Sequence, residues 1–157
     1  MDRKEVIATI RSLADQLDAL CEGLSDDELR RRPSPEKWSI LAVCCHLRDA
    51  AQIEGMRIRR LVEEDNPTLD PYDPEALAHE RDYQGDDPGR VRTTVRAFWG
   101  GLAYQLEGLS EEEWQRGGLH PESGPVTVHS RAELMAESVR LHLEQVQAAR
   151  EQLRAEG

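Results

Sequence analysis

The C-terminal part of the chain contains the pattern that most restricts the fold. Apolar residues and one histidine recur there with a strict alternation of three and four positions: Ala132, Met135, Val139, His142, Val146, Ala149 and Leu153. This spacing puts one stripe along a helix and is typical of a helix packed nearly antiparallel in a bundle. Because His142 lies within the stripe, its imidazole is predicted to point inward.

Three further segments have the same helical period. The first covers residues 6–21, the second begins at the N-cap signal Ser34-Pro35-Glu36 and runs to about residue 64, and the third covers residues 88–106. Capping boxes, in which a hydroxyl and a carboxylate each satisfy a backbone amide, are predicted at Ser25–Glu28, Ser110–Glu113 and Ser130–Glu133.

Residues 66–88 contain three proline turn signals and form a long connection, with one short helix expected at residues 74–80. Residues 119–129 are expected to be loop. The fold class is therefore all-α: a single domain, residues 1–157, folded as a four-helix bundle with a long crossover loop between the second and third long helices. Gly100-Gly101 lies inside the third helix, and we expect a neighbouring backbone or bulky side chain to approach it closely.

Composition excludes some classes of function. The net charge of −11, from 31 acidic and 20 basic residues, leaves no basic stripe for a phosphate backbone, so no nucleic-acid partner is expected. No apolar run approaches the roughly 18 residues of a membrane span, and the N-terminus lacks a signal-peptide pattern. The chain is predicted to be an acidic cytoplasmic protein. Its three cysteines are expected to be small packing residues rather than disulfides.

Two histidines are candidates for chemistry. His46 follows Cys44-Cys45 in an apolar run, and His142 occupies the stripe of the last helix, so both are expected to face the interior. Asp49, one turn after His46, is a candidate ligand or a partner that orients the His46 ring. Two alternatives stay open on these spacings. Each histidine is a core residue hydrogen-bonded locally, or the two help to hold a metal ion in the bundle core.

The sequence resembles the DinB-like superfamily, which includes YfiT-type metal-dependent hydrolases and thiol-dependent S-transferases. The resemblance covers nearly the whole chain. It rests on KWSILAVCCHLRDA, residues 37–50, with its Trp-Ser pair followed by His-Leu and Asp. It also rests on residues 108–147, with a Leu-Ser-x-x-x-Trp turn, a Gly-Pro-Val-Thr loop and a last helix that contains His-x-x-Gln.

The resemblance implies an up-down-down-up bundle that forms a homodimer and binds nickel or zinc through three histidines. His46 matches the histidine of the second helix and His142 matches the last one. The middle position of the His-x-x-x-His pair is Ser138, which is a poor ligand for these ions, and Ala51 replaces a frequent acidic residue. The predicted metal ligands are therefore His46, His142 and Asp49, and Ser138 occupies the third-ligand position of the family.

Two hypotheses for the function follow. In the first, the chain is a divalent-metal-dependent thiol S-transferase or hydrolase with an incomplete three-histidine site and a low-molecular-weight thiol as its partner. In the second, it is a metal-free bundle that binds a small molecule or another protein. The residues leave open whether the chain is an enzyme.

Overall fold

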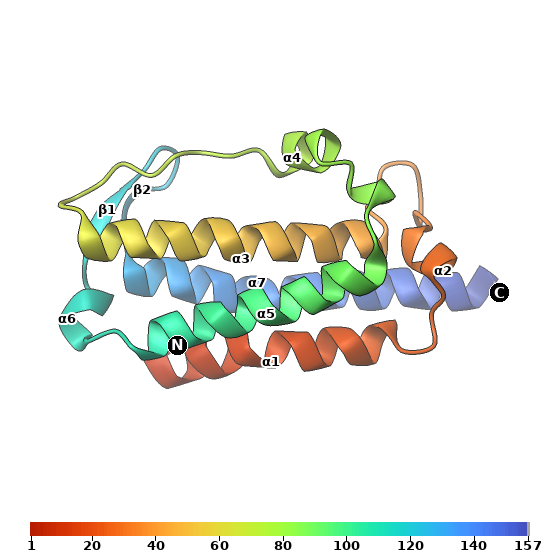
Figure 1. Cartoon of the computed structure of the whole chain (residues 1–157), viewed down its shortest axis with the longest axis horizontal. Coiled ribbons are helices and arrows are strands. Elements are labelled where there is room, and N and C mark those ends of the chain that lie inside the picture. Colours follow the sequence, from red (N-terminus) through yellow and green to blue (C-terminus); the bar gives the residue numbers. More distant parts are fainter. Residues whose placement is uncertain (157) are drawn as a thin grey trace.

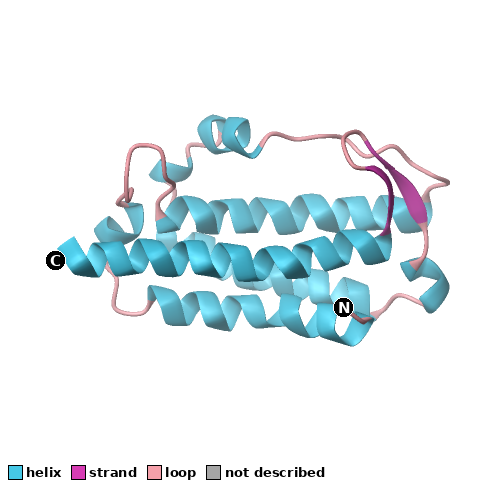
Figure 2. Cartoon of the chain, turned by 180° about the vertical axis from the view of Figure 1, so that it is seen from behind, coloured by secondary structure: helices cyan, strands magenta, loops and turns pink. Residues whose placement is uncertain are grey.

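The computed structural model describes residues 1–156 and shows a bundle of four long helices (Figure 1, Figure 2). These are α1 (Arg3–Cys21), α3 (Ile40–Glu63), α5 (Pro88–Glu107) and α7 (Val128–Glu156). The shorter elements are α2 (Asp26–Arg30), α4 (Pro74–Glu80), the 3-10 helix η1 (Tyr83–Gly85), α6 (Glu111–Trp114), β1 (Gly117–His120) and β2 (Gly124–Thr127). No helix among the described residues combines the length and apolarity that crossing a membrane requires.

The long helices have an up-down-down-up order. In Figure 1, α1 and α7 run from the end with β1 and β2 toward the end with α2, and α3 and α5 run the opposite way. Helix α3 packs against α5 and α7, and α1 packs against the same two helices. Because α3 and α5 are parallel, the chain between them must return along the length of the bundle. Residues 64–87 make this return, which confirms the predicted crossover.

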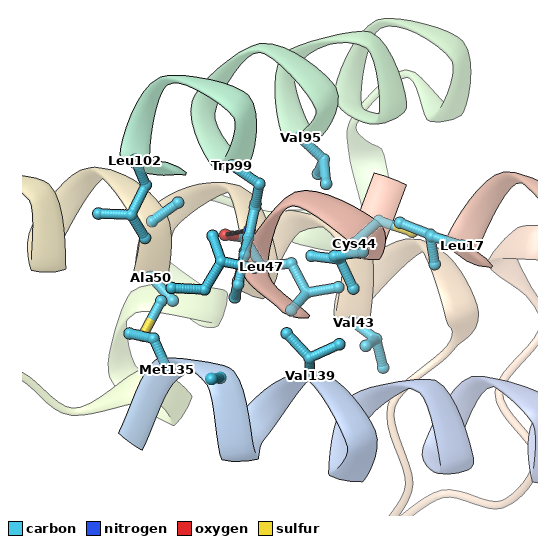
Figure 3. Packing of buried hydrophobic residues seen from close by; sticks show 14 of the residues in the cluster. Leu17, Val43, Cys44, Leu47, Ala50, Val95, Trp99, Leu102, Met135 and Val139 are labelled. Carbon is cyan, nitrogen blue, oxygen red and sulfur yellow. Dashed lines mark hydrogen bonds between the residues drawn. The ribbon is translucent and has the colours of Figure 1, made fainter. Parts of the chain in front are cut away.

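The interior is filled from all four long helices (Figure 3). Trp99 of α5 is 1% exposed, and its indole Nε1 donates a 2.8 Å hydrogen bond to the backbone carbonyl of Leu47 in α3. A buried indole needs such a partner for its N–H group. Met135 and Val139 of α7 close the same region of the core from the other side, as the stripe of the last helix predicts.

The cysteines are packing residues, as predicted. Cys21, Cys44 and Cys45 are all free and buried. Burial raises the pKa of the Cys45 thiol to about 12, and the pKa of Cys44 is also raised, chiefly through its contact with Cys21 and through burial. Neither of these adjacent thiols is therefore a thiolate at neutral pH, so neither is a ready nucleophile or metal ligand.

Several short-range predictions are confirmed. The capping boxes of α2 and α6 form at Ser25–Glu28 and Ser110–Glu113, and the short helix α4 occupies residues 74–80. The third capping box is wrong, because α7 begins one turn earlier. Thr127 and Ser130 cap its start reciprocally: each backbone amide donates to the other hydroxyl, at 2.9 and 3.0 Å.

Two segments differ from the prediction. Residues 117–127 form an antiparallel hairpin, β1 with β2, where loop was expected. The second long helix begins at Ile40 with Ser39 as its N-cap, because residues 34–37 close a separate turn in which the Lys37 amide donates to the Ser34 carbonyl. Proline after Ser34 therefore serves a turn rather than a helix start, and the two settings share the same local signal.

The expectation for Gly100-Gly101 is also wrong. A Cβ atom added at either position would meet nothing within 4 Å. The close approach occurs instead at Gly118 of β1, where an added Cβ would lie 2.5 Å from the carbonyl oxygen of Pro67 in the crossover. The glycine that the packing requires is therefore in the hairpin, not in α5.

We expect Gly100→Ala to stabilise the protein by up to about 1 kcal/mol, because alanine loses less backbone entropy in a helix and has space here. The matched control, Gly118→Ala, should instead destabilise it, because the added methyl group collides with backbone. Urea denaturation of both variants measures the two changes. A destabilised Gly100→Ala protein would contradict the open surroundings of this position.

Candidate functional site

The structure brings His46 of α3 and His142 of α7 into contact. Their ring centroids lie 4.8 Å apart with an interplanar angle of 63°, an edge-to-face arrangement. Both rings are half-buried. On the other side of His46, the indole of Trp38 lies 5.4 Å away between centroids, and its Nε1 donates to the carboxylate of Glu75 at 3.4 Å. The His46 ring therefore contacts both the Trp38 indole and the His142 ring of α7.

Burial keeps both imidazoles neutral at pH 7. Burial, with a smaller contribution from the neighbouring His142, lowers the pKa of His46 to about 4, while Asp49 acts in the opposite direction. Burial also lowers the pKa of His142, opposed by a hydrogen bond with Gln145. His142 Nδ1 lies 3.2 Å from Gln145 Oε1. A proton on Nδ1 completes this hydrogen bond and leaves Nε2 as an acceptor.

Ser138 lines the same cavity as the two histidines, but its hydroxyl donates to the backbone carbonyl of Met135 at 2.7 Å. Asp49 is buried in a different cluster. Its carboxylate accepts from Tyr83 Oη at 2.5 Å and from the guanidinium groups of Arg81 and Arg48 at 2.9 and 3.0 Å. Within residues 1–156, no three His, Cys, Asp or Glu side chains come together in a way that could hold a metal ion.

Two cavities meet at the histidine pair. The first, of about 550 Å³, lies on the Trp38 side, between the segment before α3 and the C-terminal half of α7. The second, of about 300 Å³, lies under the crossover and the β1–β2 hairpin. His46, His142 and Pro74 line both cavities. Volumes of this order are typical of small-molecule sites, and both imidazoles are in the wall of each cavity.

The hairpin and the crossover are joined where they cover the smaller cavity. The Leu119 amide donates to the Pro67 carbonyl, and the Leu69 amide donates to the Leu119 carbonyl, each at 2.8 Å. This short parallel bridge joins the segments that carry Tyr72 and His120, which line the smaller cavity together with residues of α3 and α7. The loop that the sequence predicts at residues 119–129 does not include these hydrogen bonds between the hairpin and the crossover.

The sequence interpretation also missed three charged residues in the wall of the smaller cavity: Glu54, Arg57 and Arg131. A signal for two of them was present. Arg57 follows His46 by eleven residues and Arg131 precedes His142 by eleven, and eleven residues are three helical turns on one face. Because α3 and α7 run antiparallel, residues eleven positions from the histidine pair in opposite sequence directions come together again. They do so about 16 Å from the pair along the helix axes.

We expect neutral His46 to make folding stability pH-dependent. Its pKa is about 4 in the folded protein and 6.5 in its unperturbed state, so the unfolded chain takes up the proton first as pH falls. The stability is complete above about pH 6.5 and is lost as pH falls toward 4, at up to about 1.4 kcal/mol per pH unit. Urea denaturation from pH 7 to 4.5 measures this slope.

His46→Gln should reduce that slope, because glutamine does not titrate. The control, His79→Gln, changes an exposed histidine of α4 and should leave the slope as it is in the wild type. Parallel pH profiles for the wild type and His46→Gln would contradict the prediction.

Sequence comparison with known proteins identifies relatives that are named as metal-dependent hydrolases. A protein of Geobacillus thermodenitrificans (strain NG80-2) named "Putative metal-dependent hydrolase" is 30% identical over 118 residues, which are 73% of this chain and 65% of that protein. "Putative metal-dependent hydrolase YfiT" of Bacillus subtilis (strain 168) is 23% identical over 117 residues, 74% of this chain and 66% of that protein. The chain thus spans just under two thirds of the length of these relatives.

Solved structures share the fold. The structure of YfiT from Bacillus subtilis, described as "a probable metal-dependent hydrolase with an unusual four-helix bundle topology", superposes with a TM-score of 0.86 at 20% identity over 94% of this chain and 85% of that one. The mycothiol-dependent maleylpyruvate isomerase superposes with a TM-score of 0.75 at 13% identity over 93% of this chain and 61% of that one. At these identities the likeness is one of fold.

A sequence model of an entire protein family also matches this chain. The model of the DinB superfamily matches residues 2–146, which include all four long helices at least in part. The resemblance in residues 37–50 and 108–147 is thereby confirmed. This chain belongs to the DinB superfamily.

Proposed function

We propose that this chain binds a small organic molecule where the two cavities meet, against the neutral His46–His142 pair, and that it does so without a resident metal ion. The single observation that carries the proposal is the donor set at this junction: two imidazoles 4.8 Å apart between ring centroids, with no third ligand beside them among residues 1–156. The site has the volume and polarity of a ligand pocket but lacks the chemistry of a metal centre.

The residues present do not fit a nickel or zinc ion held as the family resemblance implies. A catalytic zinc site has three protein ligands and one open position. Here Ser138 takes the third position and its hydroxyl donates a hydrogen bond to a backbone carbonyl, while three donors already bind the Asp49 carboxylate. Neither side chain supplies the missing ligand, so no chemical step is assigned to a metal.

The side chains at the junction suit a polar ligand. A neutral imidazole offers one acceptor and one donor, and its proton can be exchanged with a bound group. Gln145 holds His142 Nδ1, so Nε2 is the atom that His142 presents for this purpose. Trp38 supplies an apolar ring face beside His46, and residues of the crossover and hairpin line the smaller cavity.

Metal analysis tests the proposal. Purified without a histidine tag and dialysed against Ni²⁺ or Zn²⁺, the wild-type chain should hold well below one ion. Ser138→His restores the His-x-x-x-His pair on α7 and should raise occupancy toward one ion per chain. The control, Gln147→His, adds an imidazole at an exposed position of the same helix and should leave occupancy at the wild-type level.

One tightly held ion per wild-type chain, lost in His142→Ala, would overturn the metal-free proposal. It would favour the second candidate, a divalent-metal-dependent thiol S-transferase or hydrolase. That candidate is supported by the names of the relatives and by the likeness in fold to a mycothiol-dependent isomerase.

A thiol ligand distinguishes the two candidates further. We expect any thiol that binds at the histidine pair, with mycothiol, glutathione and cysteine as probes, to raise the melting temperature equally in EDTA and in Ni²⁺. At a hundred times its dissociation constant, a ligand adds about 2.7 kcal/mol to the stability of the folded state. The S-methylated form of each probe is the matched control for the thiol group. Stabilisation that requires Ni²⁺ and the free thiol would support the S-transferase instead.

A further inference from the structure

The wall of the 300 Å³ cavity contains a buried cluster of three charged side chains. Glu54 and Arg57 come from α3 and Arg131 comes from α7, and they are 3%, 6% and 6% exposed. Charged groups are rarely buried to this extent unless they are paired. How the charges in this cluster are paired therefore decides what the cavity can hold.

Glu54 is shared by the two guanidinium groups. Its Oε1 accepts from Arg57 Nη1 at 2.7 Å and also from Arg131 Nη2, and its Oε2 accepts from Arg131 Nε at 3.2 Å. Arg57 has two other partners: its Nη2 donates to the carbonyl of Asp70, and its guanidinium lies 5.4 Å from the centre of the Tyr72 ring. One carboxylate thus faces two cations.

The cluster therefore has one positive charge in excess. The buried cluster around Asp49 is different, because two guanidinium groups, from Arg48 and Arg81, face two carboxylates, from Asp49 and Asp86. Glu122 also lines the 300 Å³ cavity, but it is exposed, and water screens its charge. The excess charge in the buried wall has no protein counterion there.

Two donors of this cluster, Arg57 Nε and Arg131 Nη1, have no hydrogen-bond partner within residues 1–156. Arg131 Nη1 makes no hydrogen bond within residues 1–156, whereas Nε and Nη2 both bind Glu54. No fully buried side-chain nitrogen or oxygen of these residues lacks a partner, so Nη1 is accessible from the cavity that Arg131 lines. His120, in the same cavity wall, has its pKa lowered first by burial and then by Arg131 and Arg57.

We propose that the 300 Å³ cavity, whose wall also contains the histidine pair, binds a carboxylate group of the ligand at Arg131 Nη1. This inference rests on the proposed function and names the class of ligand: an elongated carboxylic acid whose remaining part extends along the cavity toward His46 and His142. A single excess charge matches a monoanion, whereas a phosphate dianion would leave a buried negative charge. A charge-assisted hydrogen bond to guanidinium is the usual way to hold a carboxylate.

The test is a titration of the full chain followed by NMR of the Arg131 Nε–H and the histidine ring protons, with EDTA present. The probes are acetate and benzoate, their uncharged amides acetamide and benzamide, and inorganic phosphate. Benzoate and acetate should shift the Arg131 signal in a saturable way and bind roughly tenfold or more tightly than their amides, because an amide forfeits the charge-assisted bond.

Variants keep the result interpretable. Arg131→Gln removes the excess charge and should abolish the preference for carboxylate over amide. Glu54→Gln doubles the excess charge and should tighten benzoate binding severalfold, a change in the opposite direction that a loss of folding cannot imitate. The matched control, Arg81→Gln, removes an arginine from the balanced cluster and should leave benzoate affinity unchanged.

Equal affinity for benzoate and benzamide, no shift of the Arg131 signal by either acid, or tighter binding of phosphate than of both acids would each overturn the inference. These failures differ from a failure of the proposed function. If benzamide shifts the His46 and His142 signals without a preference for acids, the metal-free pocket stands and only the carboxylate assignment is lost. A metal ion found in the wild-type chain would overturn the proposed function and leave the titration in EDTA valid.

Discussion

The antiparallel packing of α3 against α7 is the constraint on which the rest of the site depends. Each helix turns one stripe of side chains toward the other, and the stripes contain polar residues at matching heights. At one height they bring together His46 and His142, and two to three turns away they bring together Glu54, Arg57 and Arg131. The indole of Trp99, bonded to the Leu47 carbonyl, holds α5 against the same part of α3.

Burial then sets the chemistry of these groups. A half-buried imidazole beside another imidazole loses its proton readily, which is why the pKa of His46 falls to about 4. Cationic guanidinium groups cannot respond in this way and must keep a counterion. The neutral histidine pair and the charged cluster line the same cavity but differ in chemistry. The histidine pair suits proton exchange with a polar group, and the charged cluster suits an anion.

Most of the architecture could be predicted from local patterns. The four long helices, two capping boxes and α4 were predictable because apolar spacing and caps act over a few residues. The start of α3, the first turn of α7 and the β1–β2 hairpin were not, since Ser-Pro and Thr-x-x-Ser signals serve several local structures equally well. Neighbouring segments decide between them.

The candidate site was likewise predictable from the sequence only in part. The sequence by itself determined that His46 and His142 face inward and that Ser138 departs from a three-histidine pattern, because helical period and residue type are local properties. Only the tertiary structure decided that the two rings touch, that Asp49 belongs to Tyr83 and Arg81, and that Arg131 shares Glu54 with Arg57. These are distances between helices, and they depend on the register and direction in which the helices pack.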